Sequence, residues 1–115
     1  MRDIEKHKQR KKEFYERNKE LTRQRTRDRR GKILAFVQEY KEARACVDCG
    51  TNYPYWILEF DHVHGEKLGN ISTMVKNCSM NAILEEIEKC DVVCSNCHRT
   101  RTRNRLISSK ESILE

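Results

Sequence analysis

Two pairs of cysteines have the spacing of a metal site. Cys46-x-x-Cys49 and Cys94-x-x-Cys97 are separated by 44 residues. Tetrahedral zinc takes four thiolates, and two CxxC turns supply them with a suitable bite. A redox pair and disulfides are the alternatives, but the highly charged first thirty residues contain no secretory signal, and thiols inside a cell stay reduced. The pattern therefore predicts a structural four-cysteine zinc site whose metal binding contributes to folding.

An Asp-His pair and a further histidine accompany the cysteines. Asp61-His62 follow a β-prone segment, and His98 comes directly after Cys97. Hydrolysis of a phosphodiester needs a base to activate water and a cation to stabilise charge. Imidazole suits the base because its pKa lies near neutrality, and a carboxylate with an imidazole suits a divalent cation. Each residue alone has a structural alternative, but together they favour metal-dependent hydrolysis.

Two segments have helical periodicity. Apolar residues fall at i, i+3, i+4 and i+7 from Ile33 to Tyr40 and from Met80 to Ile87. The first predicts a helix over residues 32–43, which Gly31 separates from the charged run before it. The second predicts a helix with Ser79 as its N-cap.

Strands are expected on either side of that second helix. Residues 56–60 are β-prone and lead into Asp61-His62, and Val92-Val93 form a short second strand. Residues 63–78 are expected to form a loop with one helical turn near 73–75. Cys78 and Cys90 lie outside the CxxC pairs and are interpreted as core or loop cysteines.

A small basic cluster follows His98. Ser95 is expected to cap a final helix that runs to about Leu106, with His98 in its first turn. On that helix one face would carry Arg99 and Arg103, and a neighbouring face would carry Arg101 and Arg105. These charges suit the phosphates around a cleavage site.

The basic charge of the chain is concentrated at its start. Residues 1–30 hold 13 lysines and arginines against 6 acidic residues, a net charge of +7, whereas the other 85 residues hold 11 against 12. A solvated or partly disordered arm is one interpretation; a clamp on the DNA backbone is favoured by the excess charge. The DNA-binding candidates there are Arg23, Arg25, Arg27, Arg29 and Arg30. No run is long enough to span a membrane, so a cytoplasmic, possibly phage-encoded protein is expected.

The chain from Cys46 to about Arg105 resembles the HNH endonuclease family, in its four-cysteine phage and bacterial branch. The matching segments are Cys46-x-x-Cys49-Gly50, Leu58-Glu59-Phe60-Asp61-His62 and Val93-Cys94-Ser95-Asn96-Cys97-His98-Arg99. They cover roughly half of the chain in the family's order. The resemblance implies a ββα-metal finger, in which a two-stranded ribbon packs on a helix with the metal between them.

Site roles follow from the same resemblance. It implies that His62 is the general base and that Asp61 and His98 bind a catalytic Mg²⁺, Mn²⁺ or similar ion. DNA would be nicked or cut to leave 5′-phosphate and 3′-hydroxyl ends. His64 is a candidate for a further ligand or a phosphate contact. The position of the family's middle Asn, which orients the base, is occupied here by Lys89.

These observations predict a small α+β protein: a basic helical arm (1–44), an HNH nuclease domain (45–107) and a tail (108–115). The predicted function is that of a metal-dependent DNA endonuclease or nickase. Lys67 is a candidate phosphate contact, with an exposed loop charge as the alternative. A non-catalytic, zinc-stapled nucleic-acid-binding module is the rival function, and RNA as the nucleic acid is a weaker third possibility. The sequence does not determine a partner protein, an oligomeric state, cleavage specificity or biological role.

Overall fold

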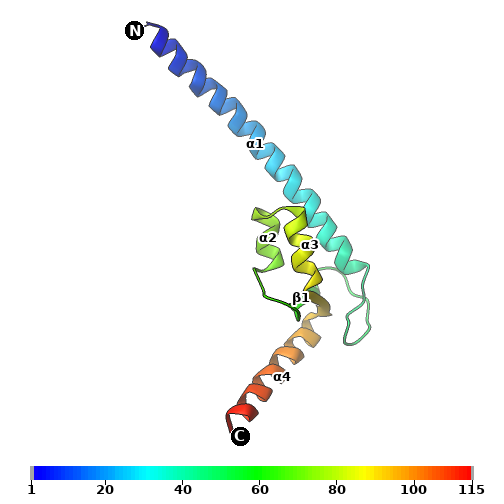
Figure 1. Ribbon diagram of the computed structural model, residues 1–115. Helices are drawn as coiled ribbons and strands as arrows, with labels where there is room; N and C mark the ends of the chain where they lie inside the picture. The colour runs from blue at the N-terminus through cyan, green and yellow to red at the C-terminus, as the bar shows by residue number, and fades with distance from the viewer. Residues whose placement is uncertain (1, 115) are drawn as a thin grey trace. The chain divides into compact units, whose positions relative to one another are not determined.

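The computed structural model describes residues 2–114, which form four helices and a two-stranded sheet (Figure 1). In chain order the elements are α1 (Arg2–Glu42), β1 (Leu58–His62), α2 (Ile71–Asn77), α3 (Met80–Glu88), β2 (Cys90–Cys94) and α4 (Ser95–Leu114). This confirms the predicted α+β class. The described chain divides into two compact units, one ending at Lys32 and the other beginning at Ile33.

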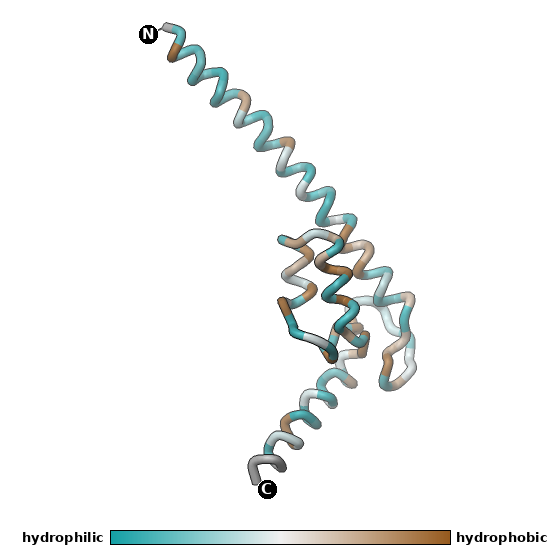
Figure 2. Tube along the Cα trace, in the orientation of Figure 1, coloured by the Kyte–Doolittle hydropathy of each residue, from teal (hydrophilic) through white to brown (hydrophobic). Residues whose placement is uncertain are grey.

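The first unit is a single stretch of α1 with almost every side chain exposed. It is hydrophilic along its length, with only isolated apolar residues such as Phe14 and Leu21 (Figure 2). Neighbouring turns are joined by contacts such as Gln24 to Asp28, at 3.0 Å. Because such pairs and the high helix propensity of Lys, Arg, Glu and Gln act locally, this stretch is helical without a core.

The predicted break at Gly31 is wrong, because α1 runs through this residue to Glu42. One glycine in a helix costs about 1 kcal/mol relative to alanine. Good helix formers precede Gly31, and buried apolar residues follow it. The helix therefore tolerates Gly31, and this single glycine is not enough to end it.

The core of the second unit joins the last turns of α1 to α2 and α3. Ile33 and Val37 of α1 belong to one buried cluster with residues of α2 and α3, namely Ile71, Met74, Val75, Ile83 and Ile87. The amphipathic helix predicted over 32–43 thus packs as expected, as the last part of α1. Ser79 caps α3, since its Oγ accepts a hydrogen bond from the Ala82 amide at 3.2 Å.

The helix α2 is longer than the single turn expected near 73–75. It extends from Ile71 to Asn77, and Ile71, Met74 and Val75 are its buried residues. Their i, i+3, i+4 spacing gives the segment one apolar face, which packing against α3 stabilises. The glycines and asparagines around it had suggested a loop.

The sheet pairs β1 and β2 in antiparallel register, from Leu58 opposite Cys94 to His62 opposite Cys90. Leu58, Val92 and Val93 form a second buried cluster with Cys46 and Cys94. The first strand begins two residues later than expected and includes Asp61-His62. The reason is a turn in which the Leu58 amide donates to the Tyr55 carbonyl at 3.2 Å.

The final helix α4 packs against both strands and carries His98 in its first turn, as predicted. Ser95 is the first residue of α4 rather than its N-cap. Its hydroxyl does not cap the helix but donates to the carbonyl of Ile57, in the turn before β1, at 3.0 Å. The helix continues to Leu114, beyond the end expected at about Leu106, so the described part of the segment 108–115 is helical. No glycine or proline interrupts that segment. Within the described chain, no helix combines the length and apolar character of a membrane span.

Candidate metal centre and catalytic cleft

The four paired cysteines converge at one point. Cys46 and Cys49 come from the turn after α1, whereas Cys94 ends β2 and Cys97 lies in the first turn of α4. All four Sγ atoms lie within 4.8 Å of one another. Gly50 takes a positive φ of 72° and its amide donates to the Cys46 carbonyl at 2.8 Å, which closes the first turn. The predicted grouping is confirmed, and the donor set suits one zinc ion.

The surroundings of the sulfurs favour thiolates that share a dication. The Cys94 amide points to the Cys46 sulfur at 3.3 Å, and the Cys97 amide points to the Cys94 sulfur at 3.4 Å. Hydrogen bonding from Thr51 lowers the pKa of Cys49 to about 6, whereas the hydrogen bond with Cys94 raises the pKa of Cys97 to about 12. Four thiolates this close together repel one another, and a divalent cation bound at the cluster would supply the compensating charge.

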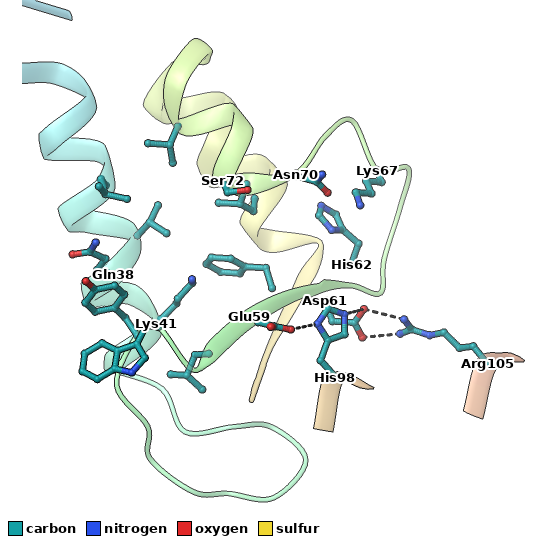
Figure 3. Close-up of a pocket in the computed structure, with 18 residues that line it drawn as sticks. Gln38, Lys41, Glu59, Asp61, His62, Lys67, Asn70, Ser72, His98 and Arg105 are labelled. Carbon is teal, nitrogen blue, oxygen red and sulfur yellow. Dashed lines mark hydrogen bonds and ion pairs between the residues drawn. The ribbon is translucent and has the colours of Figure 1, made fainter. Parts of the chain in front are cut away.

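A cleft of about 700 Å³ lies beside β1 in the second unit (Figure 3). Asp61, His62 and His98 all line it, and Lys67 and Arg105 stand at its wall. The structure thus places the three predicted catalytic residues around one cavity. They do not point to one atom, however, because Asp61 and His62 are successive residues of a strand and face opposite sides.

Asp61 and His98 form the closer pair. Asp61 is 4 % exposed, and its Oδ1 lies 3.5 Å from His98 Nε2. Two ligands at neighbouring corners of an octahedral ion are about 3 Å apart, since Mg²⁺–ligand distances are about 2.1 Å. The pair can therefore hold two corners of one divalent ion. Among the described side chains, those of residues 3–110, only the cysteine cluster gathers three or more such ligands, so water and phosphate would complete a site at Asp61 and His98.

Glu59, which was not among the site residues predicted from the sequence, orients His98. Its Oε2 lies 2.5 Å from His98 Nδ1, which leaves Nε2 directed at Asp61. A carboxylate behind a metal-binding histidine fixes the ring and raises its basicity. Strand alternation could have indicated this residue, since Glu59 and Asp61 share a face of β1.

Two arginines of α4 already bind Asp61. Arg105 holds both carboxylate oxygens, at 2.9 and 2.7 Å, and Arg101 reaches Oδ2 at 2.9 Å. These hydrogen bonds, led by that of Arg105, lower the pKa of Asp61 to about 2. Arg101 also binds Asp48 and Asp91 at 2.6 to 3.0 Å, so its guanidinium is engaged by three carboxylates rather than offered to DNA.

A divalent ion bound at Asp61 would compete with Arg105 for the same carboxylate oxygens. The Arg105 side chain is 53 % exposed and can turn into solvent. Arg105→Gln should therefore tighten Mn²⁺ binding by about fivefold, since a half-exposed ion pair is worth about 1 kcal/mol. Titration of the zinc-loaded protein, followed by the electron paramagnetic resonance signal of free Mn²⁺, measures this. Arg103→Gln is the matched control; equal affinities of the two variants would exclude the competition.

His62 is held from the other side of β1, by α3. Its Nε2 lies 3.0 Å from Glu86 Oε1, and the His62 side chain is 14 % exposed. Lys67 and Asn70 stand near it in the cleft (Figure 3). The second ring nitrogen, Nδ1, does not face Glu86.

Lys89, at the position where the family that the sequence resembles has an Asn, contacts Glu86 rather than His62. Its Nζ donates to Glu86 Oε2 at 2.9 Å and to the Glu66 carbonyl at 2.7 Å. Its own carbonyl accepts from the amides of Val63 and His64. Lys89 therefore fastens the loop after β1 to the end of α3.

The other predicted contact residues differ in exposure. His64 is exposed and is not among the residues that line the cleft, so no contact supports it as a ligand. Arg99 and Arg103 are exposed on α4, and among the side chains described, those of residues 3–110, no ion pair joins either to another residue. In the arm, Arg23 and Arg27 lie 3.9 and 3.6 Å from Glu20.

The two remaining cysteines, Cys78 and Cys90, stay outside the cluster. Cys78 packs on the core of the second unit, and the Cys90 thiol donates to the Glu86 carbonyl at 3.4 Å. Burial raises the pKa of Cys90 to about 11, which keeps it a thiol.

Compared with known proteins, the chain matches no family model, no curated protein and no solved structure.

Proposed function

We propose that this protein is a metal-dependent DNA endonuclease or nickase of the ββα-metal type. The observation that carries the proposal is the Asp61–His98 pair, backed by Glu59, in a cleft that His62 also lines. In this interpretation β1, β2 and the start of α4 form the finger, and the four-cysteine site fastens its two ends. A binding module has no need of a buried carboxylate beside a carboxylate-backed histidine.

Asp61 and His98 would hold the divalent ion, which stabilises charge on the phosphate and on the leaving oxygen. His62 Nδ1 accepts a proton from water, and the water oxygen forms a new bond to phosphorus. The bond from phosphorus to the 3′-oxygen breaks, and that oxygen takes a proton from solvent. The products carry a 5′-phosphate and a 3′-hydroxyl. Lys67, which is exposed and lines the cleft, would contact the phosphate.

We assign DNA binding to cations on two helices. On α4 these are Arg99 and Arg103. On the first unit, successive residues turn by about 100°, and all six acidic residues fall within an arc of about 160°. The opposite face has no acidic residue and carries seven cations: Lys8, Lys11, Lys12, Lys19, Arg25, Arg29 and Arg30. Such a face suits a phosphate backbone, with affinity that falls as salt rises.

Removing cations from the acid-free face should weaken DNA binding more than removing the same charge elsewhere on the arm. The test variant changes four residues to Gln: Lys11, Lys12, Lys19 and Arg25. The matched control changes four on the acidic side: Lys6, Arg10, Arg17 and Arg27. Fluorescence anisotropy with a duplex should show the slope of log affinity against log salt falling by about 3 in the test variant alone. Equal losses would mean that total charge, not a face, binds DNA.

The proposal is tested by plasmid cleavage. Zinc-loaded protein, freed of loosely held metal, is incubated with supercoiled DNA alone and with Mg²⁺ or Mn²⁺. Nicked or linear DNA that appears only with added metal, and that Asp61→Asn abolishes, supports the nuclease. The ends should be substrates for ligase after nicking, as 5′-phosphate and 3′-hydroxyl require.

The second candidate is a zinc-stapled module that binds nucleic acid without cleaving it. The observation in its favour is that two arginines bind the Asp61 carboxylate. It predicts one tight zinc per chain, no second metal and no cleavage, with salt-sensitive binding. RNA competition in the same binding assay distinguishes the preferred nucleic acid.

A further inference from the structure

Glu86 is a buried carboxylate that the reaction described above leaves unused. It lies in α3 and is 0 % exposed, whereas Glu85 and Glu88 on the same helix are exposed. Burial of an ionised carboxylate is unfavourable unless its oxygens are fully hydrogen bonded. A glutamate at this position therefore needs hydrogen-bond donors that offset the cost of removing its carboxylate from water.

Three donors satisfy Glu86. Its Oε1 lies 3.0 Å from both His62 Nε2 and the Leu68 amide nitrogen, and its Oε2 lies 2.9 Å from Lys89 Nζ. The hydrogen bond from Lys89 is the largest cause of a lowered pKa at Glu86, so this group is a carboxylate at neutral pH. An ionised carboxylate offers only acceptor atoms.

We propose that Glu86 is the positioning residue of the general base, holding His62 as the tautomer with hydrogen on Nε2 and the lone pair on Nδ1. The inference rests on the proposed nuclease function, in which His62 takes a proton from water. Because Glu86 can only accept, the nitrogen that faces it must donate. The other nitrogen then keeps its lone pair for water.

Glu86 also fixes the position of the His62 imidazole. The Leu68 amide shares the oxygen that binds His62, so the loop carrying Lys67 is fixed relative to the imidazole. Lys89 holds the second oxygen and, through the Glu66 carbonyl, the same loop. The carboxylate and lysine thus do together what a single asparagine does in the family that the sequence resembles. In serine hydrolases, a carboxylate that fixes the histidine tautomer raises kcat by orders of magnitude.

The test combines a direct reading of the tautomer with nicking kinetics. Long-range ¹H–¹⁵N spectra of the full chain at about pH 8.5, where a free imidazole is neutral, identify which His62 nitrogen carries the hydrogen. We expect Nε2–H in the parent protein. Glu86→Gln should lose this single tautomer and lower kcat for nicking by about 10²- to 10³-fold with little change in KM. Glu85→Gln and Glu88→Gln are matched controls and should leave both readings unchanged.

The outcomes separate this inference from the proposed function. Nicking with His62 as the Nδ1–H tautomer, or Glu86→Gln nicking as fast as Glu85→Gln, would overturn the role of Glu86 and leave the nuclease standing. An Nε2–H tautomer in a parent protein that cleaves nothing under any metal would overturn the nuclease, and with it the catalytic part of the inference. The tautomer of the parent protein needs no variant, so an unfolded Glu86→Gln protein cannot block the test.

Discussion

Cys94→Ser is expected to unfold the unit that begins at Ile33. Cys94 is the last residue of β2 and is 2 % exposed. Its sulfur accepts a hydrogen bond from the Cys97 amide and so joins the sheet to α4. Zinc binding by such sites is worth about 10–16 kcal/mol in small domains, which matches or exceeds the whole stability of a typical domain, about 5–15 kcal/mol. With serine in place of one thiolate, most of that free energy is lost.

Amide hydrogen exchange measures this loss. The paired amides of β1 and β2 should exchange slowly in the zinc-loaded parent and rapidly in Cys94→Ser, and a strong chelator should have the same effect on the parent. Cys90→Ser is the matched control, since Cys90 lies in the same strand but outside the cluster, and serine can still donate to the Glu86 carbonyl. Slow exchange in Cys94→Ser, with zinc still bound at one per chain, would contradict a structural role for the metal.

His62→Ala should lower metal-dependent nicking by about 10²- to 10⁴-fold, the usual contribution of a general base. The fold should survive, because Glu86 keeps its hydrogen bonds from Lys89 and Leu68. His62→Gln is a second variant that still donates to Glu86 but cannot accept a proton from water at neutral pH. Both variants should bind duplex DNA and Mn²⁺ as the parent does, because Asp61 and His98 are unchanged.

His64→Ala is the control for that experiment. This histidine lies two residues further along, is exposed and does not line the cleft, so its loss should leave the nicking rate within about twofold. If His62→Ala nicked as fast as His64→Ala, His62 would not be the base. Loss of nicking in both variants would point to a structural role of the end of β1 and the loop that follows it.

In both candidate catalytic histidines, a glutamate carboxylate contacts one ring nitrogen and leaves the other nitrogen for the proposed reaction. Glu59 binds Nδ1 of His98, and Glu86 binds Nε2 of His62. Opposite nitrogens are therefore left available: Nε2 of His98 for an ion and Nδ1 of His62 for a proton. In the proposed function, the nitrogen that each glutamate leaves open is the one that would bind the ion on His98 or accept the proton on His62.

The sequence by itself determined the features that depend on residue type and short spacing. Two CxxC turns specify their own local geometry, so the grouping of the four cysteines was predictable. The apolar i, i+3, i+4 pattern likewise predicted α3 and the packing of residues 32–43, and the position of Ser95 placed His98 in the first turn of α4. Helix limits were less predictable: Gly31 and the region after Leu106 lie within helices because neighbouring turns outweigh one weak residue.

Only the tertiary structure decided which partner each charged side chain took. Arg101 and Arg105 looked like phosphate contacts beside Arg99 and Arg103, yet they turn to Asp61, 40 and 44 residues away along the chain. Glu86 looked like another surface glutamate of α3 until β1 brought His62 to it. Local patterns do not encode such pairings, because the attraction between two charges depends on their distance and burial, and both are set when β1, α3 and α4 pack together.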